Sequence, residues 1–302
     1  MEIVHKYGGE PSFSPQFVMN VFDVLAEHGG EASLQTVEEL LAPENPTIFS
    51  DHIQLAVRLG LFETQSGLLS APESSVGRVS RLSPKTFSRF LRDVLIKPEI
   101  PNELNSLQGL FLWAYSILPL HDIGGRRTSL IPKKWQPFEI FGISSGLIGE
   151  GLVMKGDTQF APTRRWLEAL GVVVDMGKDS YALSYELMTD EILEMFNQSR
   201  VPIREFTEKV RSALPYLPGG QWNKTWNEIV QKAHVVNQSV VCIPRPDELT
   251  EIESVVLNYL RNRGEVYIED RNDAGDRMKM SIAGSDAGMI THVEFKKLEI
   301  SK

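Results

Sequence analysis

The chain has 302 residues, a length that predicts two or three domains. Hydrophobic residues make up 42% of it and charged residues 24%, a globular composition that excludes disorder over most of the chain. The net charge of −9 argues against a general polyanion binder, because non-specific DNA affinity comes from phosphates that Lys and Arg neutralise. A local basic face on an acidic body stays compatible with this total.

The cysteine count and the hydropathy predict a cytoplasmic protein that does not cross a membrane. Cys242 is the only cysteine, so no disulfide can form within the chain, which fits a reducing compartment. Residues Met1–Gly9 mix charged and apolar side chains and lack the apolar core of a signal peptide. The longest apolar stretch, Leu107–Leu120, is interrupted by polar residues and is too short to span a bilayer, so we expect a core helix there.

Residues 1–76 carry the signals of three helices followed by a β-hairpin. Apolar residues recur at helical spacing between start signals and stop signals, and a turn signal follows the third helix. In chain order these signals are Ser14-Pro15, Gly29-Gly30, Pro43, Pro46-Thr47, Gly60 and the hairpin turn Ser66-Gly67. Three helices and a hairpin in this order are the outline of a winged helix-turn-helix, which we predict over residues 1–76.

Residues 102–186 repeat this arrangement without repeating its residues. Their last part, "RWLEALGVVVDMGKDSYALS", predicts a helix, a Leu-Gly stop, a strand, a turn at Gly177 and a second strand. An earlier helix is expected over Trp135–Ser145. We predict a second winged-helix-like module over residues 102–186, and a basic helical connector over residues 77–101 joins it to the first.

A helical segment is predicted over residues 187–237 and an α+β module over residues 238–302. The module has an apolar strand over Ser239–Ile243, a helix over Asp247–Asn262 that Gly264 caps, and then further strands. These strands are expected at Glu265–Asp270, Met278–Ala283 and Ile290–Phe295, and "DRNDAGDR" predicts a hairpin turn. The module is either a third small unit or a wing that returns to the body. The fold class is mainly α with small β-wings (α+β), as tandem winged-helix modules joined by helical segments.

The connector carries a basic stripe that is a candidate for phosphate contacts. From Arg78 to Lys97 six basic residues stand against one acid, a local charge of +5. Lys85, Arg89 and Arg92 recur at i, i+4 and i+7 on one face of a predicted helix whose opposite face is apolar. Phosphate binding needs cations repeated along one face. The alternative is that this face is only solvated, as charge runs usually are.

A second basic patch belongs to the second module. It consists of Arg126, Arg127, Lys133, Lys134, Arg164 and Arg165. Arg164 and Arg165 stand at the start of the helix that helix-turn-helix proteins place in the major groove, where arginine can pair bidentately with guanine. The alternative is that these two arginines support the loop Gly124–Pro132 and never meet DNA. We predict this patch, with Lys85, Arg89 and Arg92, as nucleic-acid-binding residues.

The corresponding helix of the first module has a different surface. Over Thr47–Leu59 it carries Asp51, His52 and Arg58, so its surface is close to neutral. Such a surface suits a protein partner better than a phosphate backbone, and the fold alone does not decide between them. We therefore expect a protein partner at the first module.

The sharpest enzymatic alternative is a metal-dependent nuclease. Strand alternation puts Glu294 and Lys296 on one face, where with Asp286 they would hold a divalent ion and steady the attacking water or the phosphate. The same alternation fits a solvated edge strand, and the Pro-Asp pair typical of such nucleases is absent. A divalent-metal requirement would separate this alternative from a binding function.

Two further patterns give no catalytic or metal site. Gly142–Gly146 matches G-x-S-x-G, but the segment before it is helix-like rather than a buried strand, so a hydrolase nucleophile is not expected. The six histidines are not paired at metal-ligand spacing, and Cys242 adds no second thiol. We predict no cofactor and no metal.

Three stretches together carry a resemblance to a known family. They are "LAVRLGLFETQSGLLSAP", "FAPTRRWLEALGVV" and "VVLNYLRNRGEVYIEDRNDAGDRMKMSIAG…ITHVEF". The chain resembles the DpdG-type accessory proteins of bacterial clusters that put 7-deazaguanine derivatives into DNA and restrict unmodified DNA. The resemblance covers most of the chain. It implies a component of an anti-phage restriction system and brings no catalytic residues with it.

These observations predict a non-enzymatic accessory subunit that binds DNA, protein or both. Its expected partners are double-stranded DNA, through the local basic patches, and other protein subunits of the same system. A winged-helix transcriptional regulator is the alternative, and a regulator would usually dimerise and recognise a palindrome.

Overall fold

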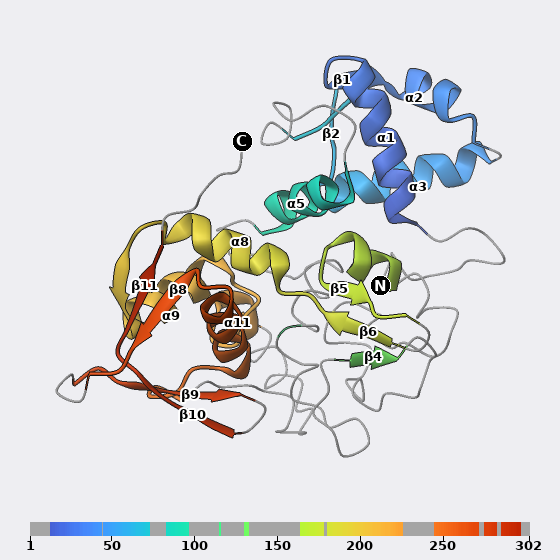
Figure 1. Ribbon diagram of the computed structural model, residues 1–302. Helices are drawn as coiled ribbons and strands as arrows, with labels where there is room; N and C mark the ends of the chain where they lie inside the picture. Colours follow the sequence, from blue (N-terminus) through green and yellow to red (C-terminus); the bar gives the residue numbers. More distant parts are fainter. Residues whose placement is uncertain are drawn as a thin grey trace. The chain divides into compact units, whose positions relative to one another are not determined.

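The computed structural model describes residues 13–43, 45–72, 83–96, 115, 130–132, 164–177, 180–225, 245–271, 275–282 and 285–296 (Figure 1). They fall into two compact units. The first unit contains the described residues up to 182, except Tyr115, and the second contains Tyr115 and the described residues from 183 to 296. Both contain helices and short antiparallel sheets, so the predicted α+β class is confirmed. No helix within these ranges is long and apolar enough to cross a membrane. The predicted core helix Leu107–Leu120 lies outside them except for Tyr115.

The first three helices begin where the sequence predicts. Each follows a residue whose side chain accepts a hydrogen bond from the first turn: the Ser14 hydroxyl accepts from Phe17 N at 3.2 Å, and Ser33 and Asn45 act in the same way. Such caps satisfy backbone N–H groups that have no partner within the helix. Proline at the first helical position supports two of the starts. The helices are α1 (Pro15–Glu27), α2 (Leu34–Leu41) and α3 (Pro46–Arg58).

A small sheet completes this part of the first unit. The predicted hairpin is present as β2 (Glu63–Gln65) and β3 (Leu68–Ser70), and positive φ angles at Ser66 (53°) and Gly67 (82°) make its two-residue turn. A strand that the sequence did not predict, β1 (Glu31–Ser33), pairs with β3 on the other side. The order β1-β3-β2 therefore places the strand that is last in the chain between the other two.

The predicted connector helix is α5 (Pro84–Leu95), and its apolar face is buried as expected. Its core residues are Phe87, Phe90, Leu91, Val94 and Leu95. The ring of Phe90 lies 4.9 Å from that of Phe22 on α1, measured between ring centroids. This contact joins α5 to the helices that precede it.

The rest of the first unit packs around a buried tryptophan. Residues 164–169 are helical, and Trp166 stacks on Phe13 with ring centroids 5.3 Å apart and donates a hydrogen bond to the Phe13 carbonyl. The following hairpin is present as predicted, and an unpredicted strand joins it in the order β4-β6-β5. The strands are β4 (Leu130–Pro132), β5 (Val173–Asp175) and β6 (Ser180–Leu183). The helix predicted over Trp135–Ser145 lies outside the described residues.

The second unit combines helices from the predicted helical segment with strands from the C-terminal module. An unpredicted strand, β7, lies between its first two helices and pairs with β11, which also pairs with β8. A second sheet consists of β9 and β10. The elements are α8 (Glu186–Met195), β7 (Arg200–Pro202), α9 (Ile203–Ala213), α11 (Glu251–Asn262), β8 (Val266–Glu269), β9 (Met278–Ile282), β10 (Ser285–Ile290) and β11 (His292–Phe295).

Three predictions for this unit are wrong in detail. The segment "DRNDAGDR" does not join a hairpin, because β8 pairs with β11 and β9 pairs with β10. The strand expected over Ile290–Phe295 is two strands in two sheets, divided at Thr291, whose side chain donates to the Glu269 carbonyl. The last helix begins four residues later than predicted, at Glu251, because Thr250 and Glu253 form a capping box there. The strand predicted over Ser239–Ile243 lies outside the described residues.

One local arrangement precedes the second strand of each three-stranded sheet in the described residues, and it also ends α1 at Gly29, before the first strand β1. A helix ends at a glycine of positive φ, the next residue donates its N–H to the carbonyl five residues back, and the chain enters a strand at the edge of a sheet. In all three sheets the last strand in the chain lies between the other two. The glycines are Gly60 (φ 74°), Gly171 (φ 65°) and Gly264 (φ 71°). The sequence predicted the sites at Gly60 and Gly171 as equivalent, and the structure adds the one at Gly264, where β9 and β10 are inserted between the strands β8 and β11.

A buried ion pair joins the two central helices of the second unit. Arg211 on α9 donates two hydrogen bonds, of 2.7 Å and 2.9 Å, to the carboxylate of Glu253 on α11. The Glu253 side chain is 1% exposed and that of Arg211 is 19% exposed. The same carboxylate accepts the Thr250 N–H at 2.8 Å, so one acid both caps α11 and ties it to α9.

We predict that Arg211→Met lowers the free energy of unfolding by about 3 kcal/mol, because it leaves a buried carboxylate without its cation while it keeps an aliphatic stem in place. The matched control is Lys209→Met on the same helix, whose pair with Glu205 is exposed and contributes less than about 0.5 kcal/mol. Urea unfolding of the full chain measures both. Equal, small effects of the two variants would contradict this account of the pair.

Candidate protein-binding groove and nucleic-acid-binding residues

The first unit contains an open groove between α2, α3 and the β2–β3 hairpin, with a volume of about 770 Å³. Apolar side chains form much of it, and polar side chains and the hairpin turn form its rim. The lining residues are Leu34, Glu38, Phe49, Ser50, Ile53, Gln54, Val57, Arg58, Thr64 and Gly67. Phe49 and Ile53 are core residues, whereas Leu34 is 37% exposed, so the groove leads from the surface down to the core.

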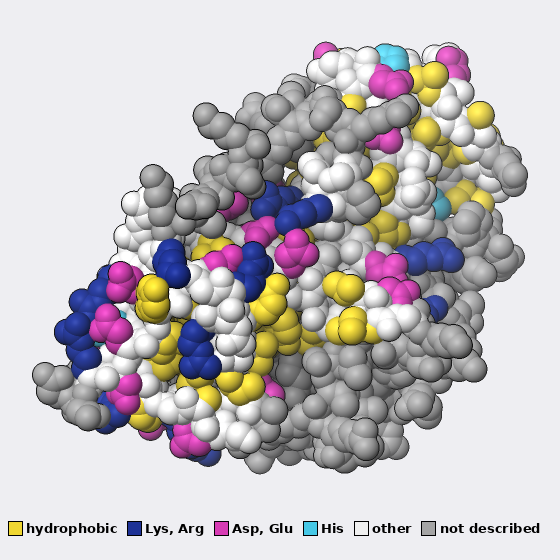
Figure 2. All heavy atoms as spheres, in the orientation of Figure 1, with side chains coloured by type: hydrophobic (Ala, Val, Ile, Leu, Met, Phe, Trp, Pro, Cys, Tyr) yellow, Lys and Arg dark blue, Asp and Glu magenta, His cyan; other side chains and the backbone are white. Residues whose placement is uncertain are grey.

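Exposed leucines lie near this groove. Leu40 on α2 is 54% exposed and Leu68 on β3 is 39% exposed, in addition to Leu34 in the lining. Single exposed apolar residues are ordinary, and of these three leucines only Leu34 lines the groove, where it adds exposed apolar surface of the kind that partners cover. On the face drawn in Figure 2, yellow apolar and magenta carboxylate side chains occupy the region of α1, α2 and α3.

The surface of this part of the chain is acidic. Within residues 13–72 Arg58 is the only Lys or Arg, against eight carboxylates, which leaves a net charge of −7. The carboxylate residues are Asp23, Glu27, Glu31, Glu38, Glu39, Glu44, Asp51 and Glu63. Glu27, Glu31, Glu39, Asp51 and Glu63 are exposed. This segment thus carries most of the net charge of the chain, and its field opposes the approach of a phosphate backbone.

The helix α3 presents few charges of its own. Asp51 and Arg58 are exposed on it, whereas His52 is half-buried with its ring against those of Phe13 and Phe17, at 5.5 Å and 5.2 Å between centroids. His52 is therefore part of the packing at the start of the first unit.

The three residues of the predicted basic stripe differ in exposure. Lys85 is exposed and Arg89 is half-buried on α5. Arg92 is only 1% exposed, so it lies in the interior of the first unit and not on the surface that a phosphate would approach. The sequence spacing predicted the side of the helix on which Arg92 lies, but it did not predict which residues pack over that side. The exposed part of the stripe is Lys85 with part of Arg89.

The second predicted patch is only partly described. Arg165 is exposed and Arg164 is half-buried at the start of the described helical residues 164–169. Arg126, Arg127, Lys133 and Lys134 lie outside the described residues. Arg165 stands six residues before Gly171, and the residues at the same distance before the other two repeated glycines are Gln54 and Asn258. One position of the repeated arrangement is thus cationic in the second occurrence and neutral in the first and third.

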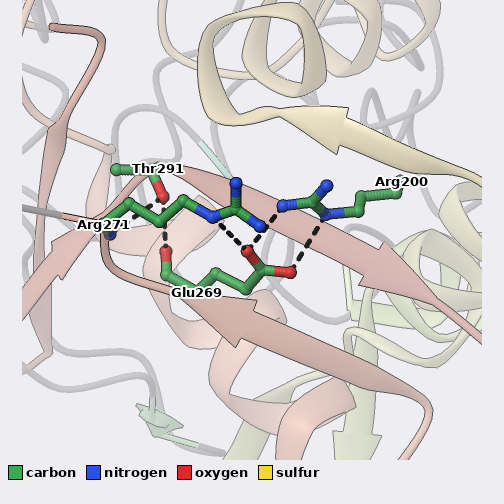
Figure 3. A network of polar contacts seen from close by, with 4 residues as sticks. All are labelled: Arg200, Glu269, Arg271 and Thr291. Atoms are coloured by element: carbon green, nitrogen blue, oxygen red, sulfur yellow. Dashed lines mark hydrogen bonds and ion pairs between the residues drawn. The ribbon is translucent and has the colours of Figure 1, made fainter. Parts of the chain in front are cut away.

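Several cations of the second unit are held in pairs with carboxylates. Arg200 on β7 makes two hydrogen bonds to Glu269 on β8, of 3.0 Å and 2.7 Å, and Arg271 donates a third to the same carboxylate (Figure 3). Thr291 ties this group to β11 through the Glu269 carbonyl and the Arg271 N–H. The hydrogen bonds from Arg200 and the charges of both arginines hold the pKa of Glu269 below its ordinary value. These arginines are committed to the sheet rather than presented singly to a ligand.

We predict that Arg200→Gln raises the pKa of Glu269 toward its ordinary value of about 4.3. Because folding depresses this pKa, the stabilisation by Glu269 is complete above the unfolded-state pKa and is lost as the pH falls through the folded-state pKa. Carboxyl-detected NMR titration measures the pKa of Glu269. The control is Arg261→Gln, which removes an arginine that is bonded to Asn258. A Glu269 pKa that is the same in both variants would refute the role of Arg200.

The residues of the nuclease alternative lie on two different sheets. Asp286 on β10 accepts the Gly288 N–H at 2.8 Å and lies 3.5 Å from the Lys279 amine, and both interactions lower its pKa. Glu294 on β11 and Lys296, directly after this strand, are both exposed, and the Lys296 amine lies 4.6 Å from the ring centroid of Tyr267. Among the residues that the structure describes, no group of three or more His, Cys, Asp or Glu could hold a metal ion. Gly142–Gly146 and Cys242 lie outside these residues.

Comparison with known proteins gives one match. A family model described as DpdG-like matches residues 9–274, well over half of the chain. No curated protein and no solved structure matches it. The match confirms the resemblance that the three sequence stretches indicate, and it spans both units of the fold. The chain belongs to the DpdG-like family.

Proposed function

We propose that this protein is a non-enzymatic accessory subunit of a bacterial DNA modification and restriction system that acts against phage, and that it holds DNA and a protein partner on separate modules. The main support for this proposal is that the first and second occurrences of the repeated arrangement differ in charge. The first occurrence of the repeated arrangement lies in a segment of net charge −7 with an apolar groove, whereas the second presents Arg165 at the position of Gln54. Family membership supplies the setting.

The modules in this proposal are winged helices. Helix, strand, helix, helix and hairpin follow one another in residues 15–70, and the last strand lies in the middle of the sheet. The second unit has the same order in α8, β7, α9, α11, β8 and β11, with additional segments between α9 and α11 and between β8 and β11. Winged helices use the third helix for DNA or for proteins, so the surface chemistry decides which.

The DNA-binding part of the proposal rests on Arg165, with Lys85 and Arg89 as further phosphate contacts. Arg165 is exposed in the described helical residues 164–169, which lead to a repeated glycine, and the sequence predicts that their helix opens at Ala161-Pro162-Thr163. The N-terminal residues of such a helix reach the base edges in helix-turn-helix proteins. Arg126, Arg127, Lys133 and Lys134 remain predicted contacts. Arg92 is left out because it is buried.

We predict that Arg165→Ala weakens binding to duplex DNA and makes the salt dependence shallower by about 0.9 in the slope of log K against log salt, because one phosphate contact releases about that many counterions. The matched control is Arg58→Ala, an exposed arginine on α3 of the acidic segment, which should leave DNA affinity unchanged. Fluorescence anisotropy across a salt series measures both. Binding that is absent at low salt, or that both variants weaken equally, would refute the assignment of DNA to the second module.

A further inference from the structure

We propose that the groove between α2, α3 and the β2–β3 hairpin binds a basic amphipathic helix of a partner protein. This inference rests on the proposed protein-binding role of the first module and names the chemistry of the partner. The bound helix inserts its apolar face into the groove, and the residues that flank this face are Lys or Arg.

The lining of the groove favours an apolar helix face. Leu34, Phe49, Ile53 and Val57 offer a continuous apolar surface from the rim to the core. A groove of about 770 Å³ lies within the range of about 300–1,000 Å³ that ligand-binding sites occupy. Amphipathic helices bind such grooves through anchors at i, i+3 or i+4 and i+7.

The charges around the groove favour a basic partner. Glu38 lies in the lining, and exposed carboxylates stand on two of the elements that frame the groove: Asp51 on α3 and Glu63 on β2. Arg58 is the only Lys or Arg within residues 13–72, and it lies in the lining together with Glu38, so the excess of negative charge comes from the carboxylates around the groove. Complementary potentials speed encounter and exclude partners of the wrong sign, so this surface selects cations next to the apolar anchors.

The charge also decides between the two classes of macromolecule that a winged helix binds. Duplex DNA would bring a row of phosphates against a segment of net charge −7, which costs affinity at every contact. A protein helix with Lys and Arg beside its apolar face meets both features of the groove. The occupant is therefore a protein segment, and DNA at this groove is an outcome that the test distinguishes.

The test uses the full chain and a labelled synthetic peptide about 20 residues long, with Leu at helical i, i+3, i+4 and i+7 spacing and Lys at the flanking positions. A second peptide carries Glu in place of Lys. The Lys peptide is expected to bind saturably, more weakly as salt rises, and the Glu peptide is expected not to bind. Absence of saturable binding of the Lys peptide, or equal binding of the two peptides, overturns the proposal.

Two pairs of variants on α2 separate groove binding from general attraction to an acidic protein. Glu38→Lys, in the lining, is expected to weaken binding roughly tenfold, whereas Glu39→Lys makes the same charge change outside the lining and stays within about twofold. Leu34→Ser is expected to weaken binding roughly tenfold, and Leu40→Ser, an exposed leucine outside the lining, is its control. Equal effects within either pair overturn the groove as the site. Unchanged circular dichroism confirms that the variants fold.

Competition with duplex DNA completes the test. DNA that displaces the Lys peptide regardless of Arg165 would show that the groove takes nucleic acid, which overturns the proposal. If DNA binding does not depend on Arg165, the peptide measurements still test the groove. If the peptide does not bind, the DNA measurements still test Arg165. The failure of this inference and the failure of the proposed DNA-binding function are therefore distinguishable.

Discussion

A glycine in the left-handed conformation at the end of a helix is the constraint on which each three-stranded sheet of this protein depends. Only glycine adopts that conformation without steric cost, and it lets the next N–H reach the carbonyl five residues back, so the helix stops and the chain leaves as a strand. The strand that leaves is three or four residues long and gains its stability from the pairing of the final strand between its two neighbours. Three repetitions of this turn give three small sheets of the same order.

The repeated backbone presents different chemistry at each occurrence. The position six residues before the glycine holds Gln54 in an acidic segment, Arg165 in the second occurrence and Asn258 in the third. In the second unit the sheet is further tied by Arg200, Glu269 and Arg271, and α9 and α11 are tied by a buried ion pair. One scaffold thus carries an acidic segment at its first occurrence and an exposed arginine at its second, and the proposed adaptor function rests on this difference.

The sequence revealed those elements whose signals are local. Capping residues such as Ser14 and stop glycines such as Gly60 act within a few residues, so helix starts and ends were predictable. The strands β1, β4 and β7 were missed because three residues carry no detectable alternation, and because their pairing partners are distant in sequence. The partner of β8 was misassigned for the same reason, since a turn signal says nothing about which strands later pair.

The candidate site was less predictable than the fold. Helical spacing placed Arg92 with Lys85 and Arg89, but tertiary packing buries it. The groove depends on the distance between α2, α3 and the hairpin, which no local pattern encodes. The acidic character of residues 13–72 could have been found by counting charges along the chain in segments rather than over its whole length.

The central claim is that DNA and a protein segment occupy different modules of one chain, and simultaneous binding tests it most directly. Labelled duplex DNA is first bound to the full chain, and the basic peptide is then added at a saturating concentration. Sedimentation velocity follows the DNA label before and after this addition. We predict a ternary complex and a DNA affinity that the peptide leaves unchanged, because the two proposed sites lie on different modules. Mutually exclusive binding, with DNA released as the peptide binds, would contradict it.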